Sequence, residues 1–203
     1  MGRWLSSLGF AALVLRYRLA PSTRHPAMLE DAREAVRVAR ADPGPSGCPA
    51  RPVGILGFSA GGHLASLVAT DVEPASGGVP DFAVLVYPVI RMTGPLAHPG
   101  CRAALTGVAD ETEMARSLDA DERVSGSTPP TFVVHGVNDE VIGIGNALAF
   151  AQACRRHGVE CELHAFADGP HGFGLARRAG PVSAWPGLCE AWMRRRTVLA
   201  SSA

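Results

Sequence analysis

The stretch from Val53 to Val68 constrains the fold most strongly, because it reads as a strand, a tight turn and a helix in direct succession. Its sequence is V-G-I-L-G-F-S-A-G-G-H-L-A-S-L-V. A serine at the centre of G-x-S-x-G, between a strand and a helix, lies on a strained turn that exposes its hydroxyl. A side chain at Gly57 or Gly61 is expected to collide with neighbouring backbone. The stretch therefore predicts a nucleophile elbow with Ser59 at its tip.

The helix after Ser59 is expected to direct its first backbone N–H groups toward the serine. That is where a negatively charged oxygen forms when a serine attacks an ester, so Ala60 N–H is the candidate oxyanion donor. A G-x-S-x-G pattern alone is also compatible with an ordinary glycine-rich turn. The choice between the two interpretations depends on an acid and a histidine later in the chain.

Both residues follow at the expected places. Asp139 lies in the loop after the apolar run Thr131–His135, and His171 lies in the glycine-rich loop after Glu160–Phe166. Loops at the carboxyl ends of parallel strands meet at one edge of a sheet. A serine needs a base to remove its proton, and the imidazole needs a carboxylate to hold its tautomer. The order Ser, Asp, His predicts a catalytic triad on an α/β fold.

The chain also has weaker candidates for the catalytic acid and base. Asp168 and Glu140 are alternative acids, but Asp168 precedes His171 by only three residues and is expected to shape that loop. An aspartate between a strand and a helix is often only a helix cap, which is the plain alternative for Asp139. Three other histidines are expected to have structural roles: His63 packs one turn into the elbow helix, and His135 and His164 lie within strands.

Buried-looking strands alternate with helices along the chain, which predicts a parallel sheet between two helical layers. Strands are expected at Phe10–Tyr17, Val53–Phe58, Phe82–Tyr87, Thr131–His135 and Glu160–Phe166. Helices are expected at 26–40, 59–71, 111–118, 144–157 and 182–198, with loops at 43–47 and 73–80. The fold class is therefore α/β, with a three-layer parallel sheet of about five strands in a single domain, residues 1–203.

Composition excludes several classes of protein. The chain is 47% hydrophobic and 19% charged with a formal net charge of zero, which is typical of a globular protein and not of a nucleic-acid binder. No apolar run is long enough for a membrane span. Five cysteines without C-x-x-C or metal-like spacing indicate free thiols in a reducing compartment. We therefore expect a cytoplasmic location and no metal or cofactor.

The N-terminal segment allows a second interpretation. Arg3 followed by the mostly apolar run Trp4–Leu15 has some features of a signal peptide. Ser6, Ser7 and Gly9 interrupt that run, and Phe10–Tyr17 has the continuous apolar pattern of a buried strand. The strand interpretation is therefore favoured.

Taken together, several motifs resemble the bacterial acetyl-xylan-esterase-like α/β-hydrolases. They are Y-R-L-A-P, G-F-S-A-G-G-H-L-A, Y-P-V-I, S-T-P-P-T-F-V-V-H-G, N-D-E-V and E-L-H-A-F-A-D-G-P-H-G-F-G-L. The resemblance covers nearly the whole chain, from about Trp4 to Trp192. It implies a serine carboxylesterase for short acyl groups, often acetyl esters of sugars. Carried over by position, Ser59 is the nucleophile, Asp139 the acid and His171 the base.

One element of the resembled family has no match here. Its members carry an H-G-G-G loop, on a strand upstream of the Y-R-L strand, that supplies oxyanion donors. The chain is therefore expected to be either truncated or a minimal hydrolase with a substitute donor. In the resembled family, the strand that carries this loop lies between the strands that correspond to Phe10–Tyr17 and Val53–Phe58. Either these two strands pair directly, or another chain covers the gap, and an apolar edge favours a homo-oligomer.

Two other functions remain open at this stage. A peptidase of the same fold would use the same triad, although the chain has no large added segment to select peptides. A catalytically silent fragment or binding module would explain the missing loop. Comparing the hydrolysis of p-nitrophenyl acetate with that of an aminoacyl anilide separates esterase from peptidase, and no turnover of either indicates the silent form.

Overall fold

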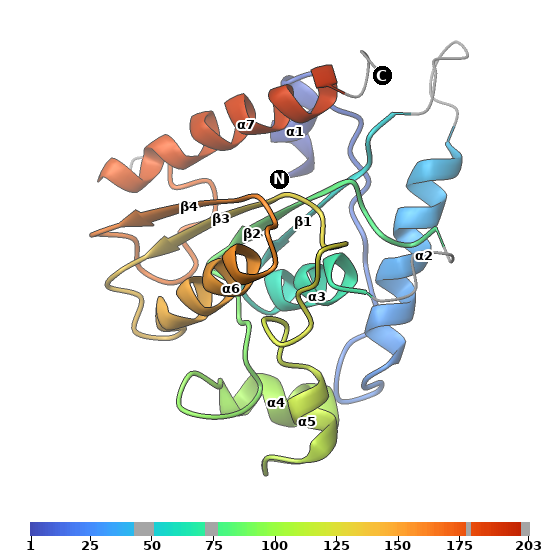
Figure 1. Ribbon diagram of the computed structural model, residues 1–203, viewed down its shortest axis with the longest axis vertical. Coiled ribbons are helices and arrows are strands. Elements are labelled where there is room, and N and C mark those ends of the chain that lie inside the picture. Colours follow the sequence, from blue (N-terminus) through green and yellow to red (C-terminus); the bar gives the residue numbers. More distant parts are fainter. Residues whose placement is uncertain (43–50, 72–76, 178–179, 200–203) are drawn as a thin grey trace.

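The computed structural model describes residues 1–42, 51–71, 77–177 and 180–199. Within these ranges four parallel strands form one sheet in the order β1-β2-β3-β4 (Figure 1). The strands are β1 (Gly54–Phe58), β2 (Phe82–Val86), β3 (Thr131–Gly136) and β4 (Cys161–Phe166). The register pairs Leu56 with Val84 and Val133 with Leu163. Chain order therefore equals spatial order, so the carboxyl ends of successive strands lie side by side.

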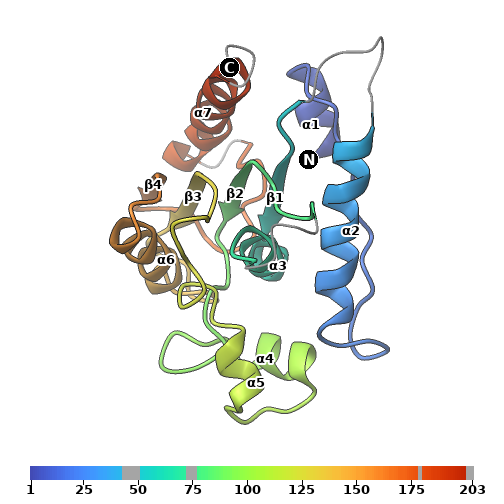
Figure 2. The same ribbon diagram turned by 45° about the vertical axis from the view of Figure 1, so that its right-hand side comes forward.

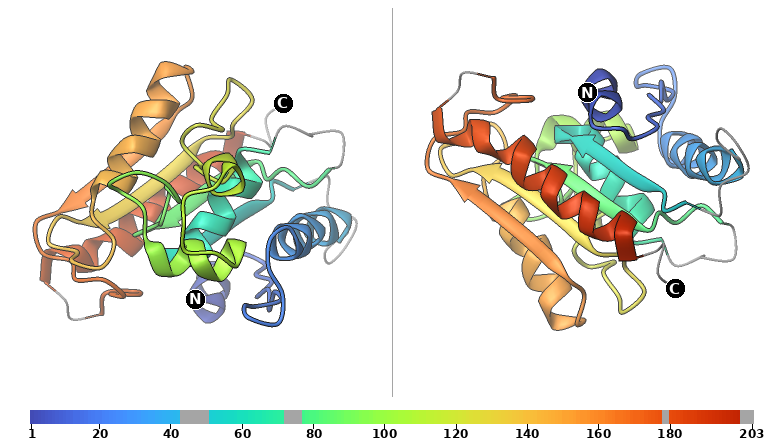
Figure 3. Two further views of the ribbon diagram at one scale, coloured as in Figure 1. Left: turned by 90° about the horizontal axis from the view of Figure 1, so that it is seen from below. Right: turned by 90° about the horizontal axis from the view of Figure 1, so that it is seen from above.

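Helices cover both faces of the sheet (Figure 3). On one face lie α3 (Ser59–Ala69) and α6 (Gly145–Arg156), and α2 (Ala27–Ala41) packs beside α3. On the other face lie α1 (Gly2–Ser7), the 3-10 helix η2 (Gly180–Ala184) and α7 (Trp185–Leu199). Two short helices, α4 (Pro99–Thr106) and α5 (Glu113–Ser117), follow β2 and lie away from the sheet (Figure 2).

Two apolar clusters hold these layers together. Leu85 and Val133 point toward α2, α3 and α6, whereas Val84 and Phe132 point toward α7. This division follows from the alternation of side chains along a strand. All five residues of β2 and all six of β3 are buried, as expected for central strands covered on both faces. The predicted α/β sheet between helical layers is confirmed.

The prediction of a strand at Phe10–Tyr17 is wrong. The segment makes no strand pairing in the described structure, and Leu13 and Val14 are 64% and 76% exposed. Contacts on either side of the segment hold it in place. Before it, Trp4 of α1 packs on Trp185 of α7 with ring centroids 5.7 Å apart. After it, Arg18 forms an ion pair with Asp31 of α2 at 2.7 Å. These anchors leave the outer edge of β1 without a neighbouring strand, so the sheet has four strands and not about five.

Most other predicted elements are present within one to three residues of the expected bounds. Helices α1 and α4 were not predicted, and the expected terminal helix at 182–198 divides into η2 and α7. The loop predicted at 43–47 and part of the loop at 73–80 lie outside the described residues. Among the described residues, no helix is long and apolar enough to cross a membrane.

Candidate active site

The turn between β1 and α3 has the geometry of the predicted elbow. Ser59 adopts a φ of +52°, a left-handed conformation that is unusual for a residue with a side chain. A Cβ on Gly57 would lie 2.1 Å from the Gly61 carbonyl oxygen, so only glycine fits there. The same expectation for Gly61 is wrong, because outside its own helix the nearest atom to its Cβ position, the Tyr17 hydroxyl, is 3.9 Å away. The second crowded glycine is Gly62, which packs against Pro88.

A continuous chain of hydrogen bonds joins three loops at the carboxyl ends of β1, β3 and β4. Ser59 Oγ lies 2.9 Å from His171 Nε2. On the other side of the imidazole ring, His171 Nδ1 lies 2.7 Å from Asp139 Oδ2. The three residues proposed from the sequence are therefore brought together in the arrangement of a nucleophile, a base and an orienting acid.

The loop around Asp139 holds its carboxylate in place. The Oδ1 atom accepts hydrogen bonds from the backbone N–H groups of Val141 and Ile142, at 3.0 and 2.9 Å. The Asp139 side chain is fully buried, so these donors replace the water that a carboxylate otherwise needs. The other oxygen is left free to face His171. The carboxylate is thus fixed in both position and orientation.

His135 also faces this carboxylate, which the sequence did not predict. Its Nε2 donates to the Ile142 carbonyl at 2.8 Å and lies 3.4 Å from Asp139 Oδ2. Complete burial lowers the pKa of the His135 imidazole, an effect that exceeds the opposing influence of the Ile142 carbonyl and of Asp139. The neutral ring therefore ties the end of β3 to the Asp139 loop. The four-residue spacing to Asp139 is the only signal for it in the sequence.

Tyr87, the first residue of the Y-P-V-I motif, is a second residue to which the sequence assigned no role. It follows β2 with a φ of +38° and packs edge-on against His171, with ring centroids 4.9 Å apart. Phe173 also packs against the Tyr87 ring, with centroids 4.5 Å apart, and the hydroxyl oxygen accepts from Gly174 N–H at 3.2 Å. Tyr87 therefore connects the end of β2 to the loop that carries His171.

The alternative residues occupy supporting positions. Asp168 accepts a hydrogen bond from Asn138 Nδ2 at 2.8 Å, and Asn138 Oδ1 accepts from Gly169 N–H at 2.7 Å, so this pair ties the Asp139 and His171 loops together. His63 donates to the Leu118 carbonyl at 2.8 Å, and burial lowers its pKa to about 4. His164 pairs with Glu162 on β4. Glu140 is exposed.

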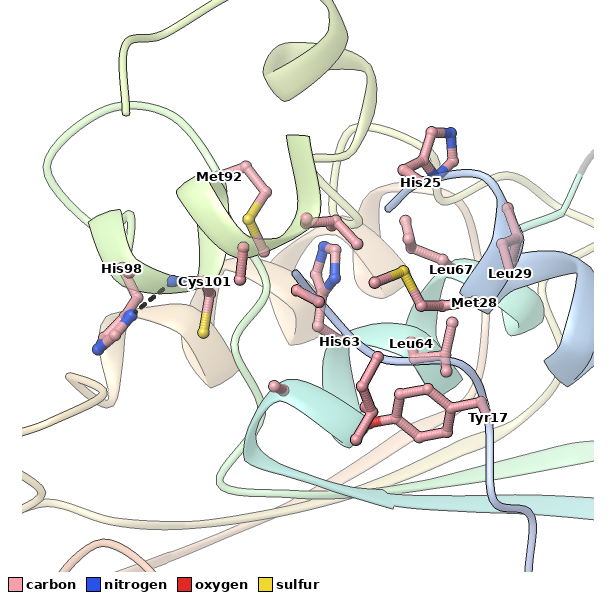
Figure 4. A pocket seen from close by; sticks show the side chains of 16 residues that line it. Tyr17, His25, Met28, Leu29, His63, Leu64, Leu67, Met92, His98 and Cys101 are labelled. Atoms are coloured by element: carbon pink, nitrogen blue, oxygen red, sulfur yellow. Dashed lines mark hydrogen bonds between the residues drawn. The ribbon is translucent and has the colours of Figure 1, made fainter. Parts of the chain in front are cut away.

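A pocket of about 350 Å³ opens beside the elbow (Figure 4). Ala60 contributes to its wall, which places the pocket next to Ser59. The other lining side chains are mostly apolar and come from the segment before α2, from α2, α3 and α4, and from the segment between β2 and α4; they include Leu19, Met28, Leu64, Met92 and Leu105. Its polar groups are Tyr17, His25, His63, His98 and Cys101. Across the described ranges, no group of three or more His, Cys, Asp or Glu side chains is arranged to hold a metal ion.

Comparison with known proteins identifies the family of the chain. Residues 2–175 match the family model described as the alpha/beta hydrolase fold. The chain belongs to the alpha/beta hydrolase family. Within it, an acetylxylan esterase of Xylanibacter ruminicola is 32% identical over 176 residues, which are 85% of this chain and 36% of that protein. The chain thus spans about a third of that relative's length.

Solved structures of the family show the same fold. An acetyl ester-xyloside bifunctional hydrolase from Caldicellulosiruptor lactoaceticus superposes with a TM-score of 0.87 at 41% identity, covering 95% of this chain and 74% of that one. A carboxylesterase from Lactobacillus plantarum gives a TM-score of 0.80 at 25% identity, covering 96% and 78%. The resemblance to acetyl-xylan-esterase-like hydrolases is confirmed by these matches.

Proposed function

We propose that this chain is a serine carboxylesterase that hydrolyses short acyl esters, with acetylated sugars as the substrate class. The observation that carries the proposal is the hydrogen-bond chain from Ser59 through His171 to Asp139. The names of the related proteins support the acetyl group and the sugar. The mostly apolar pocket beside Ser59 offers space for a small ester.

In the proposed reaction His171 Nε2 takes the proton of Ser59 as the hydroxyl oxygen attacks the ester carbonyl carbon. Asp139 stabilises the imidazolium that results. The protonated His171 then gives its proton to the departing alcohol, which leaves an acyl-serine. A water molecule, activated by the same imidazole, releases the acid and restores the hydroxyl.

The oxyanion that forms in each half of the reaction needs donors. Ala60 N–H belongs to the first turn of α3, where backbone amides have no acceptor within the helix, so it is the donor that we assign. Removing one oxyanion donor typically slows an enzyme about 10²- to 10³-fold. Ala60 N–H is therefore expected to account for a rate factor of this size.

The test is a pre-steady-state measurement with p-nitrophenyl acetate. The proposal expects a burst of p-nitrophenol close to one equivalent per chain, followed by a slower steady rate, since the acyl-serine forms before it hydrolyses. An aminoacyl p-nitroanilide serves as the amide substrate and should not turn over. Turnover of the anilide instead would favour the peptidase, and no release from either substrate would favour the silent form.

The partner and location assignments are proposals as well. The outer edge of β1 lacks a neighbouring strand in the described part of the chain, and exposed apolar side chains at Leu13 and Val14 lie in the segment beyond α1. An unpaired edge favours association with a second copy. Sedimentation at micromolar concentration tests this, and a stable monomer would overturn it. The four described cysteines are free thiols, in keeping with the proposed cytoplasmic location.

A further inference from the structure

The hydroxyl of Tyr17 lies beside the start of α3, where the oxyanion of the proposed reaction forms. Tyr17 and Ala60 line the same pocket, and the Tyr17 ring directs its hydroxyl toward the first turn of this helix (Figure 4). The hydroxyl oxygen is 3.9 Å from the position that a Cβ on Gly61 would occupy. Because a Cβ on a helix is tilted toward the helix N-terminus, this position lies on the Ala60 side of Gly61. The hydroxyl therefore faces the end of α3 that carries the assigned oxyanion donor.

The fold leaves this hydroxyl without a partner. In the described part of the chain the Tyr17 hydroxyl makes no hydrogen bond, whereas the Tyr87 hydroxyl accepts one from Gly174 N–H. The Tyr17 ring is partly buried and packs against the apolar cluster that contains Leu64. A polar group at the wall of an apolar pocket needs water or a ligand as its partner. Tyr17 thus presents a free donor to a substrate that enters the pocket.

Gly61 keeps the space in front of this hydroxyl open. Its backbone is helical and not left-handed, and outside its own helix a Cβ would meet no atom closer than 3.9 Å. Neither backbone conformation nor crowding therefore requires glycine at position 61, in contrast to Gly57. The missing side chain leaves the Tyr17 hydroxyl a path to the helix start. A substrate carbonyl beside Ser59 has room to occupy that path.

Two features keep the hydroxyl in position as a donor. The next residue, Arg18, donates its backbone N–H to Asp31 Oδ2 at 2.9 Å, and its side chain pairs with the same carboxylate. These bonds fix the backbone beside Tyr17 to α2. Burial, with a smaller effect from Cys101, raises the pKa of Tyr17 above its ordinary value. The hydroxyl therefore keeps its proton at neutral pH.

We propose that Tyr17 is a catalytic residue whose hydroxyl donates a second hydrogen bond to the oxyanion, together with Ala60 N–H. This assignment rests on the proposed esterase function. As Ser59 Oγ bonds to the carbonyl carbon, the π electron pair of the C=O bond moves onto the oxygen, and the Ser59 proton goes to His171 Nε2. The Tyr17 O–H then donates to a negative charge, where it faced a neutral carbonyl before. Because this bond strengthens in the transition state, it raises kcat more than it lowers KM.

The first experiment compares the parent chain with Tyr17→Phe, which keeps the ring and removes only the hydroxyl. With p-nitrophenyl acetate we expect the burst rate and kcat to fall about 10²-fold, and KM to stay within about threefold of the parent value. Cys101→Ala is the matched control, because it changes the same pocket wall and leaves the Tyr17 hydroxyl in place. Its kcat should stay within about threefold of the parent value. Equal unfolding midpoints of the parent and Tyr17→Phe serve as the folding control.

The second experiment measures a property that a purely structural role would not change. A short-chain alkyl trifluoromethyl ketone accepts the Ser59 oxygen at its carbonyl carbon and forms a tetrahedral oxyanion, whereas the corresponding trifluoromethyl carbinol has no carbonyl to attack. Tyr17→Phe should weaken ketone binding by about the factor by which kcat/KM falls, since the ketone adduct resembles the transition state. Its affinity for the carbinol should equal that of the parent chain.

Three outcomes would overturn the role of Tyr17 and leave the proposed function intact. They are a burst in Tyr17→Phe as fast as that of the parent chain, an equal fall of kcat in Tyr17→Phe and Cys101→Ala, and an equal weakening of ketone and carbinol binding. Absence of a burst from the parent chain would instead overturn the proposed function, and the role of Tyr17 with it.

Discussion

Tyr87 packs the edge of its ring against the imidazole of His171, with centroids 4.9 Å apart and planes inclined at 61°. This contact holds the imidazole from the side, while Asp139 and Ser59 hold its two nitrogen atoms. The ring thus has three partners from three different strand ends. Its orientation depends on the whole edge of the sheet and not on one loop.

Replacing Tyr87 should therefore act on kcat more than on KM. We expect Tyr87→Ala to lower kcat about 10- to 100-fold, because a base that is free to rotate spends less time aligned with Ser59. Tyr87→Phe retains the ring contact and loses only the acceptor for Gly174 N–H, so it should lose less than about tenfold. Steady-state kinetics on p-nitrophenyl acetate measures both. Equal losses in the two variants would contradict the role of the ring.

Ser59→Ala should remove turnover and leave the fold unchanged, because the hydroxyl is on a partly exposed turn and contributes little packing. The burst of p-nitrophenol should disappear with it. Circular dichroism and the unfolding midpoint serve as the folding controls. If more than about a hundredth of the parent rate survived, another nucleophile would have to be present.

Asp139→Asn should lower kcat by about 10⁴-fold, since an amide donates where the carboxylate accepts and favours the wrong imidazole tautomer. Asp168→Asn is the matched control. Asp168 contacts Asn138 and not His171, so its loss should affect activity by less than about tenfold. Kinetics of the two variants under identical conditions compares them. A larger loss from Asp168→Asn would mean that the acid is assigned to the wrong residue.

The buried His63 should make the protein sensitive to acid. Burial lowers its pKa to about 4, whereas the unfolded chain titrates near the usual value of 6.5. The unfolded state therefore binds more protons between these values, so the free energy of unfolding falls as the pH drops from about 6.5 toward 4, and is fully retained above 6.5. The difference corresponds to about 3 kcal/mol at most.

Urea unfolding between pH 4.5 and 8 measures this dependence. His63→Gln keeps a side-chain donor for the Leu118 carbonyl and carries no titrating group, so its stability should fall less steeply with acid than that of the parent protein. Some dependence of stability on pH should persist in this variant, because burial also lowers the pKa of His25 and His135. Identical slopes for parent and variant would show that His63 does not contribute.

Among acyl chains, we expect kcat/KM to be highest from acetyl to butyryl. The pocket of about 350 Å³ lies near the lower end of the volumes typical of ligand sites, and α4 closes one side of it with Ala104 and Leu105. A series of p-nitrophenyl esters from acetyl to decanoyl gives the profile. A kcat/KM that rose continuously to the decanoyl ester would contradict the expected preference.

The sequence predicted the sheet and its strand ends because these depend on local signals. Largely apolar runs at 82–87 and 131–135 are typical of buried strands of a parallel sheet, and the second is followed closely by Asn138 and Asp139. The positions of Ser59, Asp139 and His171 then follow from topology alone. The contacts of His135 with Asp139 and of Tyr87 with His171 were not predicted, because they depend on which side chains meet across neighbouring loops, and that information is absent from the local pattern.

For the segment from Phe10 to Tyr17, the structure predicted from the sequence is wrong. Its apolar pattern is that of a buried strand, but a strand also needs a partner at pairing distance, which no local pattern reports. Here the contacts Trp4–Trp185 and Arg18–Asp31 fix the ends of the segment, and β1 has no strand on its outer side. Local propensity was therefore overridden by contacts made far along the chain.

The left-handed backbone of Ser59 and Tyr87 has a consequence for laboratory evolution of this protein. Both residues adopt a φ that glycine adopts without cost and other residues only with strain of about 1 kcal/mol or more. Ser59 contributes little packing, so a library that is selected only for survival of heating is expected to enrich glycine at position 59, whereas the buried ring of Tyr87 keeps its place there. Heat tolerance and ester hydrolysis would then be in direct competition at position 59, so selection has to include turnover from the first round.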